Sequence, residues 1–113
     1  MNIQIFGKNK CFDTKKAERY FKERGIPFQK IDLVRYGMSD GEFASVKRAL
    51  GGIEPMLDKG GKAYEKHYIA YLAEPAAVEE KMLEYPELIR TPIVRNGKQA
   101  TVGYAPEIWK EWK

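Results

Sequence analysis

Residues 2–33 read NIQIFGKNKCFDTKKAERYFKERGIPFQKIDL, and this stretch decides the fold. It begins with a short apolar run at residues 2–6, which a glycine ends, as expected for a buried strand. Over residues 13–24 apolar side chains recur at three- and four-residue spacing, which predicts an amphipathic helix that Gly25 stops. Residues 28–33 then alternate apolar and polar side chains, as a second strand does. Strand, helix and strand in succession form a βαβ unit, so we expect the two strands to be parallel.

The middle of the chain is predicted to be helical. Ser39 and Glu42 form a capping box that opens the first of three helices. A second helix is expected at about residues 62–72, and a third begins at Pro75, a favoured first helical residue. The side chains expected to face the core on these helices are Phe43, Val46, Leu50, Tyr64, Tyr68, Tyr71 or Leu72, Val78, Met82 and Leu83.

Two strands and a short helix are predicted at the end of the chain. Residues 92–95 and 98–102 indicate a hairpin, because the Asn96-Gly97 pair between them suits a type I′ turn. Pro106 can open a last helix with Ile108, Trp109 and Trp112. The order β-α-β, helices, β-β-α resembles a thioredoxin-like fold, an α/β fold with a mixed four-stranded sheet. We expect a single domain over residues 1–113, with a helical insertion at about residues 39–86.

Composition narrows the classes of partner. The net charge of +4 comes from lysines and arginines interleaved with acids, which is typical of solvated helix faces, so we expect no direct nucleic-acid partner. No apolar run approaches the roughly 20 residues that span a bilayer, and one cysteine forms no internal disulfide. These features predict a cytoplasmic protein without a membrane partner. The lone His67 has no companion at a metal-binding spacing, and we expect neither a metal nor a bound cofactor.

Cys11 is the candidate reactive centre, because it lies between the first strand and the first helix. Unpaired amides and partial positive charge at a helix N-terminus stabilise a thiolate, and Lys8 and Lys15 would add to this effect if they lie close. Thr14 occupies the place of the second cysteine in a Cys-x-x-Cys motif, and its hydroxyl can donate to the sulfur or cap the helix. A buried free cysteine that acts as a small hydrophobe is the alternative interpretation of Cys11.

Arg90, Thr91 and Pro92 form the second candidate feature. Pro92 can simply open an edge strand. Alternatively, it forms a cis-proline loop that faces the cysteine, where the Thr91 backbone pairs with an extended thiol substrate.

Several segments along the chain belong together: Ile5-Phe6-Gly7, Cys11, Lys15-Lys16-Ala17, residues 25–28, Ile31-Asp32, residues 88–90, residues 92–94 and residues 102–109. These segments resemble the arsenate-reductase-related proteins, and the resemblance covers essentially the whole chain. The family includes glutathione- or glutaredoxin-dependent arsenate reductases and Spx-type transcription regulators that bind RNA polymerase. The resemblance implies a thioredoxin-like fold and a nucleophilic cysteine, which here is Cys11.

The chain departs from both groups within this family. The arsenate reductases bind the oxyanion with three arginines, and arginine suits that task because its planar fork holds two oxygens at once. The corresponding positions here carry Thr91, Asp58 or Lys59, and Tyr104, which argues against arsenate reduction. Spx-type regulators often carry a Cys-x-x-Cys switch, and Thr14 removes its second thiol.

We therefore expect a monothiol oxidoreductase in which Cys11 is the nucleophile and an external thiol such as glutathione, or a protein thiol, resolves the mixed disulfide. Two alternatives stay open: a non-enzymatic, Spx-like module that docks on RNA polymerase or another protein, and arsenate reduction at a rearranged anion site. The expected supporting residues are Thr14, Lys8 and Lys15 for the thiolate, and Thr91, Pro92 and Arg90 for the substrate.

Overall fold

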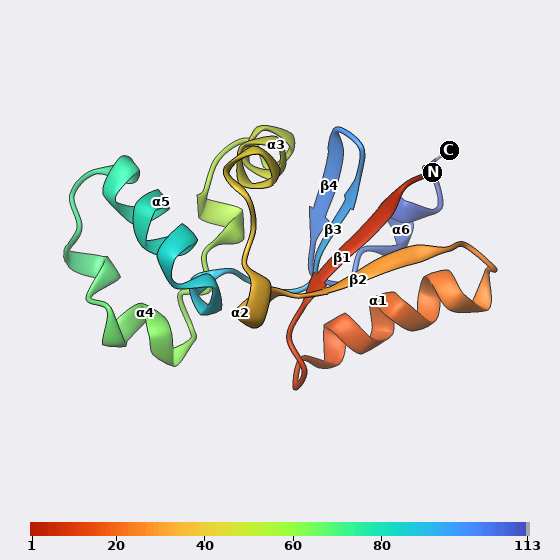
Figure 1. The fold of residues 1–113 in the computed structure, drawn as a ribbon, viewed down its shortest axis with the longest axis horizontal. Helices are drawn as coiled ribbons and strands as arrows, with labels where there is room; N and C mark the ends of the chain where they lie inside the picture. Colours follow the sequence, from red (N-terminus) through yellow and green to blue (C-terminus); the bar gives the residue numbers. More distant parts are fainter. Residues whose placement is uncertain (113) are drawn as a thin grey trace.

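The computed structural model describes residues 1–112 (Figure 1). Strands and helices follow one another in the expected order, but a short helix and three 3₁₀ turns are added between the second and third strands. The added helix begins at Leu33, which was expected to end the second strand. The elements are β1 (Ile3–Gly7), α1 (Phe12–Glu23), β2 (Phe28–Asp32), α2 (Leu33–Tyr36), α3 (Asp40–Leu50), η1 (Glu54–Met56), α4 (Lys62–Lys66), η2 (Ile69–Tyr71), α5 (Pro75–Glu84), η3 (Pro86–Leu88), β3 (Ile93–Asn96), β4 (Gln99–Val102) and α6 (Pro106–Trp109).

The four strands form one mixed sheet in the order β2-β1-β3-β4. β1 and β2 are parallel, with Ile3 opposite Phe28, which confirms the βαβ unit. β3 runs antiparallel to both β1 and β4. The predicted mixed four-stranded sheet is therefore confirmed, and β1 lies at its centre with Cys11 just beyond its C-terminal end.

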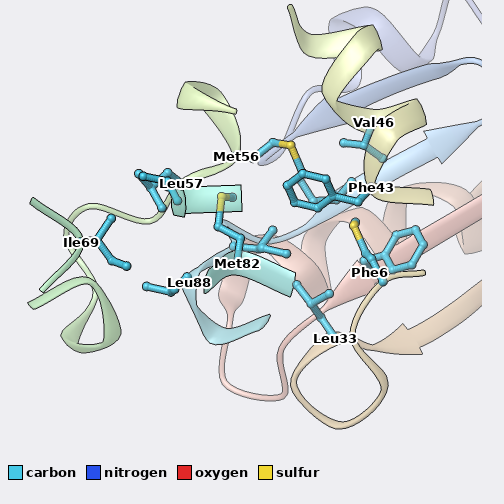
Figure 2. Close-up of a cluster of buried hydrophobic side chains, with 13 residues drawn as sticks. Phe6, Leu33, Phe43, Val46, Met56, Leu57, Ile69, Met82 and Leu88 are labelled. Carbon is cyan, nitrogen blue, oxygen red and sulfur yellow. The ribbon is translucent and has the colours of Figure 1, made fainter. Parts of the chain in front are cut away.

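Alternating side chains of β1 feed two hydrophobic clusters, one on each face of the sheet. Ile3 and Ile5 pack with α1 and α6. Phe6 packs instead with α3 and with residues 54–88, which we call the helical segment (Figure 2). The first cluster contains Ile3, Ile5, Ala17, Tyr20, Phe21, Val94, Ala105, Trp109 and Trp112. The second contains Phe6, Leu33, Met38, Phe43, Val46, Met56, Leu57, Ile69, Val78, Met82, Leu88, Ile89 and Ile93.

The capping box that opens α3 is confirmed. The Ser39 hydroxyl accepts from the Glu42 amide at 3.1 Å, and the Glu42 carboxylate accepts from the Ser39 amide at 2.9 Å. α3 packs against β4, whereas α4 and α5 lie to the side of the sheet (Figure 1). None of the helices within residues 1–112 combines the length and hydrophobicity needed to cross a bilayer.

The helix expected at residues 62–72 is interrupted. α4 ends at Lys66, and Tyr68 takes a left-handed conformation with φ of 55°, after which η2 begins. The break turns Ile69 inward and leaves Tyr68 and Tyr71 69% and 84% exposed. The prediction that Tyr68 faces the core is therefore wrong, because the helix breaks at this residue. Of the two alternatives at the next turn, Leu72 packs against the core and Tyr71 does not.

The hairpin is confirmed, but its turn type is not. Asn96 pairs with Gln99, so the central residues of the turn are Gly97 and Lys98. Of these, Gly97 has a φ of 62°, as the first central residue of a type II′ turn requires. Asn96 remains in the strand because it also lies opposite Ile3 of β1.

Candidate thiol site

The loop between β1 and α1 holds Cys11 at the helix N-terminus. The Cys11 amide donates to the Lys8 carbonyl at 3.2 Å, and the Cys11 carbonyl accepts the Lys15 amide at 3.3 Å. Cys11 is therefore the N-cap residue of α1, with extended backbone angles, and its side chain lies beside the free amides of the first helical turn.

Thr14 locks this loop against the end of β1. Its side chain is only 3% exposed, and its hydroxyl accepts from the Lys8 amide at 3.4 Å. A Cβ on Gly7 would overlap the Thr14 methyl group. Gly7 is thus required by the close approach of α1, and this contact fixes the position of Thr14 relative to Cys11.

The structure brings Cys11 and Thr91 together although they are 80 residues apart in the chain. The partly exposed Cys11 thiol donates to the Thr91 carbonyl at 3.5 Å. The Thr91–Pro92 peptide bond is cis. The Pro92 carbonyl accepts a hydrogen bond from the Gly103 amide at 2.9 Å. This bond joins the Thr91–Pro92 segment to the end of β4.

The surroundings of Cys11 favour the thiolate. Burial alone raises the pKa of the Cys11 thiol, but hydrogen bonds from the Thr14 and Thr91 side chains and from the Thr14 and Asp13 amides outweigh it. The net result is a Cys11 pKa below the ordinary value of a cysteine thiol. A partly exposed thiolate at a helix N-terminus is the form of cysteine that acts as a nucleophile.

Lys8 connects the cysteine loop to the segment that precedes β3. Its side chain is only 22% exposed, and its Nζ donates to the Glu87 carbonyl at 2.9 Å. The Asp58 carboxylate lies 3.9 Å from the same Nζ. Burial lowers the pKa of Lys8, against the opposing effects of Asp58, Cys11 and Glu87. Lys8 is therefore close enough to Cys11 for the two charges to interact, but its hydrogen bond goes to the Glu87 carbonyl.

Two other expected site residues lie at the edge of this arrangement. Lys15 is exposed and borders a hollow of about 120 Å³ between the start of α1 and the end of β2. Arg90 is also exposed, and its amide donates to the Met56 carbonyl at 2.7 Å. That bond belongs to a short antiparallel contact in which Leu57 faces Ile89. Roles for Lys15 and Arg90 in the chemistry therefore stay predictions.

The residues that the resemblance puts at the three arginine positions are Thr91, Asp58 or Lys59, and Tyr104. Asp58 offers a carboxylate to Lys8, and it lies so close to Gly61 that a Cβ there would be 2.6 Å from Asp58 Oδ2. Tyr104 is 44% exposed, with the Lys16 ammonium 5.7 Å from its ring centroid. None of these four side chains is an arginine, so none supplies the planar, fork-like pair of donors that holds two oxygens of a tetrahedral anion.

Phe12 is an exposed residue beside Cys11 that was not among the expected site residues. Phe12 follows Cys11 directly and is 78% exposed. Its signal in the sequence was an apolar side chain outside the periodic core face of the predicted helix, which consists of Ala17, Tyr20 and Phe21. The Glu87 carbonyl, which accepts from Lys8, has no sequence signal because any residue supplies a carbonyl.

The chain resembles known proteins both in sequence and in structure. Residues 6–112 match the model of the ArsC family. The chain is 23% identical to the "Global transcriptional regulator Spx 2" of Oceanobacillus iheyensis, over all of this chain and 94% of that protein. An arsenate reductase structure from Vibrio cholerae is 25% identical and has a TM-score of 0.86, covering 98% of this chain and 97% of the other.

The fold is also similar, more distantly, to that of a glutaredoxin-like protein. The glutaredoxin-like protein NrdH-redoxin from Escherichia coli is 16% identical, with a TM-score of 0.51 over 100% of this chain and 96% of the other. These likenesses establish the thioredoxin-like fold that the order of elements predicted. Because the family model spans nearly the whole length, from the end of β1 to beyond α6, the chain belongs to the ArsC family.

Proposed function

We propose that this protein is a monothiol oxidoreductase that uses Cys11 to exchange thiols with disulfides. Membership of the ArsC family and the thioredoxin-like fold support a redox-type or an Spx-like role. The observation that carries the first of these is the position of Cys11. Its partly exposed thiol belongs to the N-cap residue of α1 and lies 3.5 Å from the Thr91 carbonyl, next to the cis Thr91–Pro92 bond. The lowered pKa of Cys11 agrees with this role. Thr14 stabilises the thiolate, and the Thr91–Pro92 segment positions the partner.

The exchange takes place in three balanced steps. The Cys11 thiolate attacks one sulfur of a disulfide, the S–S bond breaks, and the other sulfur leaves as a thiolate. An external thiolate of the glutathione class then attacks the Cys11 sulfur, which frees the substrate as a thiol. A second external thiolate attacks the external sulfur of that mixed disulfide and regenerates Cys11. The substrate gains two electrons, and two external thiols become one disulfide.

The direct test compares the wild type with Cys11→Ser. Turnover of a small disulfide such as hydroxyethyl disulfide is measured with glutathione as reductant, coupled to glutathione reductase. The wild type should exceed the uncatalysed rate, and Cys11→Ser should equal it, because a serine hydroxyl does not attack disulfides at neutral pH. Retained turnover in Cys11→Ser would contradict the proposal.

A second candidate function is a regulator that binds RNA polymerase. Its support is the similarity to two proteins described as global transcriptional regulators Spx, of which one is matched over the whole of this chain. This role requires docking rather than turnover. A pull-down with bacterial RNA polymerase should then succeed equally with the wild type and with Cys11→Ser, and no capture of either would exclude it.

Arsenate reduction is the least supported candidate. The resemblance puts Thr91, Asp58 or Lys59, and Tyr104 where the reductases carry arginine. Asp58 is paired with Lys8, and Lys59 with Glu54. We therefore expect no arsenate turnover above that of Cys11→Ser in a glutathione-coupled assay.

A further inference from the structure

Phe12 exposes a large apolar surface immediately beside the candidate nucleophile. It is the first residue of α1, it is 78% exposed, and it follows Cys11 directly. Exposed aromatic side chains that are buried on contact supply much of the binding energy in protein interfaces. α1 begins next to the β1–α1 loop, which lies at the lower edge of the molecule in the view of Figure 1.

Tyr104 provides a second exposed aromatic side chain at the same site. The Lys16 ammonium lies 5.7 Å from its ring centroid, and Lys16 is one helical turn beyond Phe12 on the same face of α1. Gly103, its neighbour, donates through its amide to the Pro92 carbonyl at 2.9 Å, and Thr91 accepts from the Cys11 thiol. Phe12 and Tyr104 therefore stand on the elements that adjoin Cys11, and we call these two residues the aromatic rim.

Within four residues of Phe12 the chain carries four lysines and one acid, Asp13, and one exposed acid, Glu107, follows Tyr104 three residues later. Lys10, Lys15 and Lys16 are exposed. The Asp13 carboxylate, 3.9 Å from the Lys16 ammonium, only weakly compensates the charge of Lys16. Asp58 is paired with Lys8 and does not offset the charge of the other lysines. A partner of opposite charge would therefore be attracted, and the attraction would weaken as salt screens it.

We propose that the disulfide substrate of Cys11 is carried by a protein, on an extended acidic segment with an apolar side chain beside its cysteine. The apolar side chain packs on the aromatic rim, and the acidic residues face Lys10, Lys15 and Lys16. This inference rests on the proposed thiol–disulfide exchange and assigns its substrate class. Glutathione serves only as the external thiol in the later two steps.

Three mixed disulfides of thionitrobenzoate test the proposal, because each releases a coloured thiolate when Cys11 attacks. One carries an acidic peptide with leucine beside its cysteine, one the same peptide with lysines in place of the acids, and one mercaptoethanol. At low salt the acidic peptide should react about tenfold faster than the lysine peptide, and added salt should reduce this ratio. Equal rates for the two peptides would overturn the proposal.

Phe12→Ala tests the rim separately from charge. The rate with the acidic peptide, divided by the rate with the mercaptoethanol disulfide, should fall about threefold or more, because an anchoring side chain is lost. Tyr71→Ala is the matched control, since Tyr71 is 84% exposed in η2, and it should leave the ratio unchanged. An unchanged ratio in Phe12→Ala would contradict the proposal that the aromatic rim binds the substrate. Absence of release from all three disulfides would refute the thiol chemistry itself, and the substrate assignment with it.

Discussion

At the scale of single residues, the Thr14 hydroxyl has two tasks. It accepts from the Lys8 amide, which holds the loop, and its hydrogen bond to the sulfur lowers the pKa of Cys11. A hydroxyl can do both because it has one donor and two acceptor sites. Replacement of the second cysteine of a dithiol motif by threonine therefore removes internal disulfide formation without removing support for the thiolate.

Thr14→Val keeps the shape of the side chain and removes the hydroxyl. Loss of a hydrogen bond worth about 1 kcal/mol should reduce iodoacetamide alkylation of Cys11 at pH 7 about fivefold. Thr101→Val is the matched control, because the other buried threonine accepts from Trp109 Nε1 at 2.7 Å. It should lower the free energy of unfolding by about 1 kcal/mol and leave alkylation unchanged. Wild-type alkylation in Thr14→Val would contradict the role of the hydroxyl.

The lowered pKa of Cys11 also makes stability depend on pH. Because the folded state holds the thiolate at a lower pH than the unfolded chain does, the thiol contributes stability above the unfolded pKa. This contribution is lost as the pH falls through the folded-state pKa. The free energy of unfolding of the wild type, relative to Cys11→Ser, should therefore increase from pH 5 to about pH 9, measured by urea unfolding at each pH. A difference that is flat or decreases with pH would oppose this account.

At the scale of elements, the junction of β1 and α1 depends on Gly7. A methyl group there would overlap Thr14, whose branched and buried side chain has little room to move. Gly7→Ala should lower the free energy of unfolding by about 1–3 kcal/mol and slow Cys11 alkylation as Thr14 is displaced.

The control for this substitution is Gly41→Ala in α3. An added Cβ at Gly41 meets no atom within 4 Å, so the higher helix propensity of alanine should raise stability by up to about 1 kcal/mol. Urea unfolding and alkylation of both variants provide the comparison. If Gly7→Ala proved as stable and as reactive as the wild type, the close packing described above would be wrong.

The elements that could be predicted from sequence are those with strong local signals. The apolar run, the amphipathic helix and Gly25 define the βαβ unit, and the Ser39–Glu42 pair defines the start of α3. The break at Tyr68 could not be predicted, because a left-handed conformation is rare for tyrosine and depends on the burial of Ile69. Likewise, Cys11 was found by its position, whereas its contact with Thr91 required the fold.

At the scale of the whole molecule, Lys8 links the sheet to the helical segment. Its Nζ bridges Glu87 and Asp58, and hydrogen bonds from the Asp58 amide to Leu88 and from the Arg90 amide to Met56 lie on the same seam. The hydrogen bond from the Lys8 ammonium is partly buried, and a charged bond in such a place stabilises the fold more than an exposed ion pair does. The position of the helical segment thus depends on a residue in the cysteine loop.

Lys8→Met should accelerate hydrogen exchange at the Asp58 and Arg90 amides by about tenfold, because a charged hydrogen bond worth about 1.5 kcal/mol is lost. Lys59→Met is the matched control, because its partner is the exposed Glu54. This variant should leave exchange at both amides unchanged. Equal effects of the two substitutions would show that Lys8 has no special part in the link.

The most direct test of the central claim is the pH dependence of iodoacetamide alkylation, on folded and on urea-unfolded protein. Cys11 is the only thiol, so the rate reports its thiolate fraction alone. We predict a folded-state pKa below that of the unfolded chain, with alkylation of the folded protein already substantial at neutral pH. A folded-state pKa equal to or above the unfolded value, or a thiol that reacts only after unfolding, would contradict activation of Cys11 by the fold.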